Sequence, residues 1–264
     1  MTMPLSNDNR VIQSLWIGPA LSAMEQLGIA SYLANGHEFH LYVYDRVANL
    51  PDGTTVRDAG EILPSSRIFQ YTRHASYAGF ANFFRYKLLA ERGGWWSDTD
   101  SVCLKPFSFA TEYVFSSEFS KGVHMVNNGL IKAPAGSALM EWAWRECDAR
   151  DTATLEWGET GPVLMGHGVE RFGLKQYVQD FTTFCPLPYK SWNLLIDPKA
   201  DIEPGDQSYA VHLWNEQWRS AGADKDAHYH PGCLYERLRR RYLGSNERIS
   251  IERVESLLRS LGSR

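Results

Sequence analysis

The apolar residues of this chain switch repeatedly between the alternation typical of strands and the three- to four-residue spacing typical of helices. Residues 11–18 ("VIQSLWIG") predict a strand, residues 20–36 a helix that ends at a glycine, and residues 38–45 ("EFHLYVYD") a second strand. A strand, a helix and a strand in this order form a β-α-β unit, from which parallel sheets are built.

A second long helix is predicted for residues 74–94, where large apolar side chains share one side and Gly93 is placed as a left-handed cap. Trp95 and Trp96 then begin a strand that ends near Asp98. Further strands are predicted for residues 112–118, 124–133, 182–187 and 208–214, and further helices for residues 136–149 and 161–168. The order predicts an α/β fold, with a mostly parallel central sheet flanked by helices.

Composition narrows the class of protein. With 264 residues, 44% of them hydrophobic, the chain is long enough for one domain with additions. A formal net charge of −4 argues against a nucleic-acid-binding surface. The four cysteines show neither metal-binding nor disulfide spacing, which favours a reducing compartment. Since we find neither a secretion signal nor an apolar stretch long enough to cross a bilayer, we expect a cytoplasmic protein.

The candidate chemistry lies at Asp98 and Asp100. Open α/β sheets bind ligands at the carboxyl ends of their strands, and carboxylates one residue apart can hold a hard divalent cation. The alternative is a loop in which the two side chains accept backbone hydrogen bonds. Cys103 and Phe109 exclude a calcium-binding EF-hand loop, because that loop needs Gly and Glu at these positions. A haloacid-dehalogenase-type phosphatase stays a minor alternative, although its Asp-x-Asp belongs after the first strand.

The run of residues 81–100 ("ANFFRYKLLAERGGWWSDTD") resembles the signature of the DXD-motif glycosyltransferases of the sugar-binding-region group. This group is similar to glycosyltransferase family 32 and includes globotriaosylceramide synthase and bacterial capsule and lipopolysaccharide transferases. The segments "LWIG", "VNNGLIKAPAGSALM", "TGPVLM" and "HLWNEQW" extend the resemblance over most of the chain. The chain departs from the pattern at Asn82, where the family usually has Asp.

The resemblance implies a GT-A fold, which is Rossmann-like, and a site that takes a nucleotide sugar with Mn2+ or Mg2+. Asp98, Asp100 and His212 would hold the metal, and Arg85 would hold the diphosphate or the sugar. Structural hydrogen bonding is the alternative for His212, and a surface ion pair is the alternative for Arg85.

The donor pocket is expected to draw on six further residues. A uracil base would lie between strand exits, amides would bind sugar hydroxyls, and an indole would cap the donor. The base would contact Trp16, Ile17 and Tyr44. The sugar hydroxyls would bind Asn82 and Asn128, and Trp218 would cap the donor. Core packing is the alternative for the aromatic residues, and a turn is the alternative for Asn127 and Asn128. The sequence singles out no nucleophile, although Glu159 and Glu216 are the nearest acidic residues.

These features predict a metal-dependent, retaining transferase that moves a hexose from a UDP-sugar to a saccharide or glycolipid acceptor in surface polysaccharide synthesis. A non-catalytic carbohydrate-binding protein of the same fold is the alternative, and Asn82 favours it. We assign residues 1–232 to the transferase domain and residues 233–264 to a helical extension.

The extension carries two amphipathic segments. Residues 233–244 ("CLYERLRRRYLG") are rich in arginine and suit an anionic membrane surface, with an ordinary surface helix as the alternative. Residues 249–262 carry an apolar stripe for packing on the body or on a second subunit. Just before and at the start of the extension, His228, His230 and Cys233 offer a zinc site or, alternatively, a simple connector.

Overall fold

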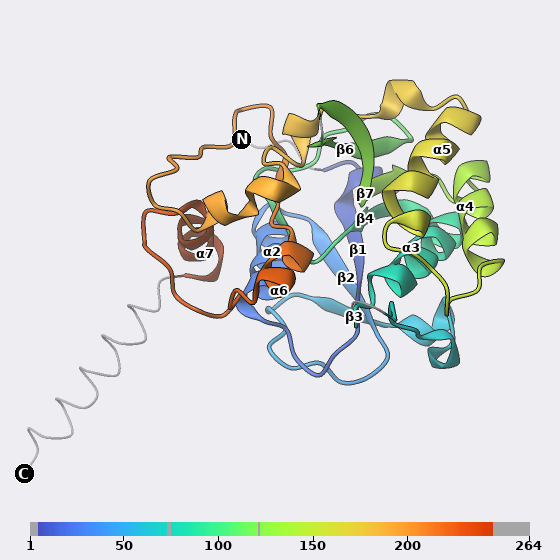
Figure 1. Ribbon diagram of the computed structural model, residues 1–264, viewed down its shortest axis with the longest axis horizontal. Helices are drawn as coiled ribbons and strands as arrows, with labels where there is room; N and C mark the ends of the chain where they lie inside the picture. The colour runs from blue at the N-terminus through green and yellow to red at the C-terminus, as the bar shows by residue number, and fades with distance from the viewer. Residues whose placement is uncertain (1–4, 73–74, 121, 245–264) are drawn as a thin grey trace, which may run out of the picture.

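The computed structural model describes residues 5–72, 75–120 and 122–244, and it is built on a six-stranded sheet. The strands lie in the order β3 (Thr55–Asp58), β2 (Glu38–Val43), β1 (Val11–Trp16), β4 (Gly94–Ser97), β7 (Val123–Ala133) and β6 (Val114–Ser120). Neighbours from β3 to β4 are parallel, whereas β7 is antiparallel to both β4 and β6 (Figure 1). The predicted α/β class with a mostly parallel central sheet is confirmed, and this arrangement is consistent with the expected GT-A fold.

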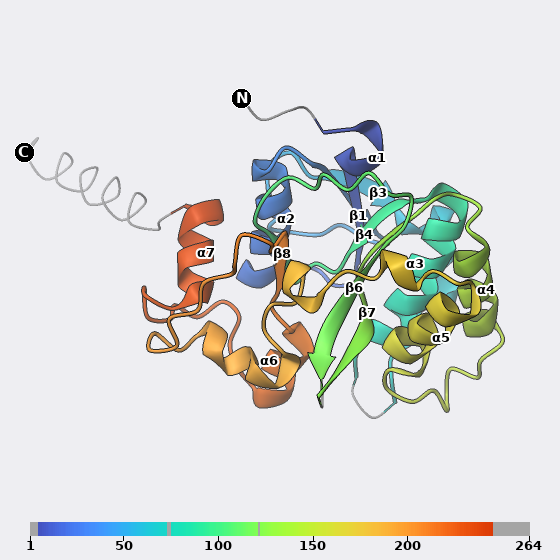
Figure 2. The ribbon, with the colours of Figure 1, turned by 90° about the horizontal axis from the view of Figure 1, so that it is seen from above.

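Helices cover both faces of the sheet (Figure 2). One layer contains α3 (Ala78–Arg92), α4 (Ala138–Asp148) and α5 (Leu164–Arg171). The other contains α2 (Ala23–Ala34), α6 (Asn215–Ala221), α7 (Leu234–Leu243) and the two-stranded sheet of β5 (Ser101–Cys103) and β8 (Ala210–His212). A short helix, α1 (Asn7–Arg10), precedes β1. Both layers meet the central strand β4, where Trp96 packs into the α3 side and Trp95 into the α2 side.

Short turns of helix connect these elements. The 3-10 helices are Ala59–Glu61, Ser65–Arg67, Lys175–Tyr177, Phe181–Thr183 and Tyr189–Leu195, and a π-helical turn, Glu159–Val163, leads into α5. The predicted strand at residues 182–187 is wrong: Asp180 caps a 3-10 turn there by accepting from the Thr182 N–H, and Pro186 lacks the donor that a strand ladder needs.

The loop after β4 rests directly on α2. A Cβ atom at Gly28 of α2 would lie 2.1 Å from the carbonyl oxygen of Thr99, so a side chain larger than hydrogen does not fit there. The same helix turns Tyr32 toward β4, where its hydroxyl lies 2.8 Å from Ser97 Oγ. Helix α2 therefore fixes the height of the Asp98–Asp100 loop above the sheet.

Helix α7 packs against α2 in both views (Figures 1 and 2). Its apolar side, with Leu234, Tyr235 and Leu238, is buried in one cluster with Met24 and Leu27. The apolar side of the arginine-rich segment 233–244 is therefore covered by the protein body, and the exposed side carries Arg240 and Arg241.

None of the helices in the described ranges is long and apolar enough to cross a membrane. The domain boundary at residue 232 and membrane contact stay predictions. The stripe predicted at residues 249–262 lies outside the described residues.

A buried histidine, His37, joins the start of β2 to α1 and to the loop that contains Phe107. Nδ1 of His37 lies 2.9 Å from the Asn9 carbonyl oxygen, and Nε2 accepts the N–H of Phe107 at 3.1 Å. Because Nε2 must stay unprotonated to accept that bond, Nδ1 carries the proton and the ring is neutral. Burial lowers the pKa of His37 from 6.5 to about 4, which agrees with the neutral form.

Candidate functional site

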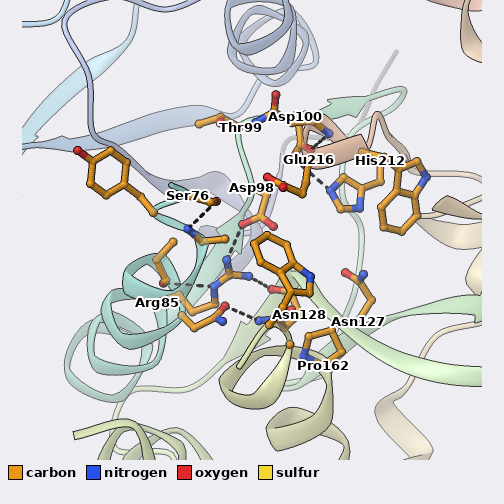
Figure 3. A pocket seen from close by; sticks show the side chains of 18 of the residues that line it. Ser76, Arg85, Asp98, Thr99, Asp100, Asn127, Asn128, Pro162, His212 and Glu216 are labelled. Carbon is orange, nitrogen blue, oxygen red and sulfur yellow. Dashed lines mark hydrogen bonds and ion pairs between the residues drawn. The ribbon is translucent and has the colours of Figure 1, made fainter. Parts of the chain in front are cut away.

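A cavity of about 830 Å³ opens at the carboxyl ends of β1 and β4. Its walls also include the first half of β7, because β7 runs in the opposite direction and brings Asn127 and Asn128 to the same edge. Asp98, Asp100, His212 and Arg85 all line this cavity (Figure 3). The structure thus brings together residues that are up to 127 positions apart in the sequence.

Asp98, Asp100 and His212 form a cluster suited to a cation. One ligand atom from each residue lies within 4.8 Å of the others. His212, the last residue of β8, reaches the cluster because β5 directly follows the Asp98–Asp100 loop and pairs with β8, which places Ser101 opposite His212. Of the residues that the structure describes, these three form the metal-compatible group, so the alternative zinc site at His228 is not supported.

The electrostatics of the cluster differ between its two carboxylates. Burial opposes ionisation of Asp100, but His212 at 3.2 Å and the Asn215 N–H at 2.8 Å outweigh it and lower the pKa of Asp100 to about 2. Burial also opposes charge on His212, but Asp100 outweighs it and raises the pKa of the imidazole well above its usual value. Burial raises the pKa of Asp98, and Arg85 opposes that shift.

Arg85 is held in one orientation beneath Asp98. Its guanidinium lies 2.9 Å from Asp98 Oδ1, donates to the Asn128 carbonyl oxygen, and lies 4.9 Å from the centre of the Trp96 ring. The Trp96 indole N–H donates to the same Asp98 oxygen at 2.9 Å. Since the Arg85 side chain is 4% exposed, the surface ion pair that was its alternative role is excluded.

Two amides form the floor of the cavity beside Arg85. Asn128 Nδ2 donates to Asn82 Oδ1 at 2.8 Å and to the Tyr86 hydroxyl at 3.1 Å. Asn82 Nδ2 donates in turn to Thr160 Oγ1 at 3.3 Å, and the Tyr86 hydroxyl donates to the Thr160 carbonyl oxygen at 2.9 Å. This network ties the π-helical turn to α3 and β7. Each polar atom of the Asn82 side chain, the departure from the family pattern, thus has one partner in the network, and one of its amide N–H groups is not used there.

Of the other residues predicted to contact the donor, two line the cavity and two do not. Trp16 and Ile17 line the cavity at the end of β1. Tyr44 instead packs against Phe80 and donates its hydroxyl to the Leu63 carbonyl oxygen at 2.8 Å. Trp218 is fully buried against Tyr235, so the predicted donor-capping role of Trp218 needs correction.

Trp214 lines the cavity where Trp218 was expected to. Its ring centre lies 4.1 Å from that of His212. The backbone of Trp214 has a φ of 61°, a left-handed conformation that sends the next residues into α6. Sequence reasoning chose the wrong tryptophan of "HLWNEQW" because nothing in the letters shows that a non-glycine residue adopts this conformation.

Sequence reasoning also missed Glu118, on β6. It lines the cavity, is 8% exposed, and accepts from Asn127 Nδ2 at 3.2 Å. Burial raises the pKa of Glu118, with His212 opposing. The only feature of the sequence that could have indicated Glu118 is its place as a charged residue at the end of the strand predicted for residues 112–118. Glu216 also lines the cavity, whereas Glu159 pairs with Arg150.

One comparison with known proteins covers the segment that carries Arg85, Asp98 and Asp100. Residues 39–119 match the model of a family described as a glycosyltransferase sugar-binding region containing a DXD motif. A search of curated proteins finds no match. The expected DXD-type glycosyltransferase region is confirmed over these matched residues.

Two solved structures that are similar to parts of this chain are glycosyltransferases. The PaToxG glycosyltransferase is 12% identical, with a TM-score of 0.47, over 89% of this chain and 86% of its own. The apo-form glycosyltransferase GlyE of Streptococcus pneumoniae TIGR4 is 12% identical, with a TM-score of 0.35, over 67% of this chain and 46% of its own.

Proposed function

We propose that this glycosyltransferase is metal-dependent and moves a hexose from a nucleotide sugar, specifically a UDP-sugar, to a saccharide or glycolipid acceptor. The observation that carries the proposal is the Asp98, Asp100 and His212 cluster, which faces Arg85 at the carboxyl edge of the sheet. The position of the motif also disfavours the phosphatase alternative, because Asp98 follows β4 rather than β1.

The ligand atoms fit a hard divalent cation such as Mn2+ or Mg2+. Two carboxylate oxygens and one imidazole nitrogen suit either ion. Ligands on opposite sides of a cation, each about 2.1–2.4 Å from it, lie about 4.2–4.8 Å apart, and the three atoms here lie within 4.8 Å of one another. When bound, the cation would act as a Lewis acid that neutralises charge on the departing diphosphate.

The chain's own residues orient the donor. Arg85, fixed between Trp96 and Asp98, presents a permanent positive charge to the phosphate or sugar oxygens. Asn82 and Asn128 lie on the cavity floor and offer amide oxygens and N–H groups to sugar hydroxyls. We assign sugar binding to these amides because both side chains are already oriented by Tyr86 and Thr160 before a ligand arrives.

The nucleotide end of the cavity is assigned to Trp16 and Ile17. The buried Nε1 of Trp16 and the buried hydroxyl of Ser14 have no hydrogen-bond partner among the described residues, although both residues line the cavity. Buried polar groups are normally hydrogen-bonded, so an unpaired donor and hydroxyl at a cavity wall suit a ligand with exposed carbonyl and N–H groups, such as uracil.

We further propose that transfer retains the anomeric configuration, that the leaving phosphate accepts the acceptor's proton, and that the product enters surface polysaccharide. No protein nucleophile is assigned. Peripheral contact with the inner face of the cell membrane belongs to the same proposal and would depend on exposed arginines such as Arg240 and Arg241.

Calorimetric titration with a panel of nucleotides and nucleotide sugars, with and without Mn2+, tests the proposal. UDP and one UDP-sugar should bind in the presence of metal, and Asp100→Ala should abolish the metal-dependent part. Asp206→Ala, at an exposed carboxylate away from the cavity, is the matched control and should bind like the unmodified protein. Absence of nucleotide binding with and without metal would refute the donor assignment and favour the non-catalytic carbohydrate-binding alternative.

A further inference from the structure

The end of the cavity away from the Asp98, Asp100 and His212 cluster has a different chemistry. Its described side chains come from residues 71–78, before and at the start of α3, and from residues 157–163, which include the π-helical turn. They are aromatic, aliphatic or hydroxyl side chains without formal charge, among them Tyr71, Ser76, Tyr77, Trp157 and Val163. The metal end, in contrast, carries the buried charges of the site.

Three large apolar side chains of this wall are unusually accessible. Tyr77 is 36% exposed, Trp157 45% and Val163 46%, and each of them lines the cavity. The Trp157 ring is also supported from behind, because its centre lies 5.0 Å from that of the buried Tyr71. An indole that is accessible and yet supported by a second ring presents a flat apolar surface at the mouth of a polar cavity.

The wall is coupled in space to the donor end. Ala78, Ala81, Asn82 and Arg85 lie along one side of α3, so the cavity follows this helix from the aromatic wall to the guanidinium. Seven residues of helix from Ala78 to Arg85 correspond to about 10 Å. This length leaves room for a transferred sugar at Arg85 with one further ring between it and the aromatic wall.

Hydrogen bonds also fix the loop that carries the indole. Thr160, three residues after Trp157, binds Asn82 through its hydroxyl and Tyr86 through its carbonyl oxygen. The loop continues into a π-helical turn. This conformation is rare in proteins overall, but many of its examples lie at functional sites. The aromatic wall is therefore set in place by the same residues that we assign to the donor sugar.

We propose that Trp157, Tyr71 and Tyr77 form the acceptor subsite of this enzyme and that its occupant is an uncharged pyranose ring. The apolar face of such a ring packs on an aromatic side chain, while its hydroxyls bind polar neighbours such as Ser76. An anionic acceptor is disfavoured because the described side chains of the wall offer no positive charge. This inference rests on the proposed transfer of a sugar at the metal end.

Fluorine NMR of the protein labelled with 5-fluorotryptophan tests the subsite. Trp157→Phe identifies the Trp157 resonance by its loss, and Trp142→Phe identifies an internal control from α4, whose ring packs on Phe172 outside the cavity. The probes are methyl β-glucopyranoside, methyl β-galactopyranoside and methyl α-mannopyranoside, with glucose 6-phosphate as the anionic probe. Each is titrated in the presence of UDP and Mg2+, because paramagnetic Mn2+ would broaden the resonances.

At least one neutral glycoside should shift the Trp157 resonance saturably and leave the Trp142 resonance unchanged. In Tyr77→Ala, which keeps the reporter, the dissociation constant of that glycoside should rise about twofold to tenfold. Tyr77 is a suitable position because it is partly exposed and precedes α3, so the truncation leaves the core intact.

Three outcomes would overturn the subsite: no response of Trp157 to any neutral glycoside, parallel shifts of Trp157 and Trp142, or tighter binding of glucose 6-phosphate than of the neutral probes. The UDP titration of the same labelled sample separates this failure from failure of the proposed function. If UDP with Mg2+ binds and the glycosides do not, the subsite is wrong and the donor site stands. If UDP does not bind, the donor assignment has failed.

Discussion

Replacing Gly28 by alanine should inactivate the enzyme from a position outside the cavity. The added Cβ would lie 2.1 Å from the Thr99 carbonyl oxygen, whereas real Cβ atoms essentially never come closer than 3.0 Å to another atom. The helix or the loop must therefore move by about 0.9 Å. The partner is backbone rather than a flexible side chain, so the movement displaces Asp98 and Asp100 on either side of Thr99.

The expected magnitudes differ for activity and stability. A displacement of about 1 Å in reacting groups costs on the order of a hundredfold in rate, so kcat/KM should fall by about that factor. Overpacking costs about 1–3 kcal/mol, and the higher helix propensity of alanine returns about 1 kcal/mol, so the free energy of unfolding should fall by about 0–2 kcal/mol.

Gly166→Ala is the matched control. Gly166 lies in α5, and nothing lies within 4 Å of the position of its Cβ atom. This variant should be more stable by up to about 1 kcal/mol with unchanged activity. The assays are metal-dependent hydrolysis of the UDP-sugar that binds and urea denaturation. If Gly28→Ala keeps full activity and gains the stability expected of Gly166→Ala, the contact with Thr99 does not position the loop, and the reasoning is refuted.

Three further predictions concern buried hydrogen bonds. The first concerns His37, whose imidazole is neutral in the folded and unfolded chain above pH 6.5. As the pH falls from 6.5 to 4, the unfolded chain binds a proton at His37 with a pKa of about 6.5, whereas the folded chain binds it only near pH 4. The free energy of unfolding should therefore fall by about 3 kcal/mol between pH 6.5 and pH 4. Urea denaturation as a function of pH measures it, and an equal slope in His37→Gln would contradict it. Tyr86→Phe removes two buried hydrogen bonds, one to the Thr160 carbonyl oxygen and one from Asn128 Nδ2, and should lower the free energy of unfolding by about 1–3 kcal/mol. This loss should exceed that of Tyr44→Phe, which removes one bond, and equal losses in urea would argue against the network. Arg85→Lys keeps the charge but cannot make all the contacts of the guanidinium, so kcat/KM should fall at least tenfold, and unchanged kinetics would exclude its role.

The sequence predicted most of the elements because their patterns are local. The helix before Gly93 and the strand at Trp95 and Trp96 are confirmed, and the cap has a φ of 65°. The two tryptophans also show why local patterns suffice for a central strand: successive side chains point to opposite faces, and here both faces are buried.

Tertiary context decided what the sequence could not. The pairing direction of β7 depends on its hairpin with β6, and only that direction brings Asn128 to the carboxyl edge of β1. Which of Trp214 and Trp218 faces the cavity depends on one left-handed residue. Glu118 gave no motif because its significance arises from burial beside Asn127, nine residues away across a hairpin.

The Asp98–Asp100 loop rests on α2, which α7 covers, and this arrangement has a consequence for how the protein is made. Helix α2 begins at Ala23 and its cover, α7, at Leu234, so the ribosome synthesises the second about 200 residues after the first. Until then, the apolar cluster that contains Met24 and Leu27 lacks Leu234, Tyr235 and Leu238. A nascent chain that already contains Asp98 and Asp100 would therefore carry them on a loop whose supporting helix, α2, is only partly covered, and we expect activity to arise late in synthesis, with α7.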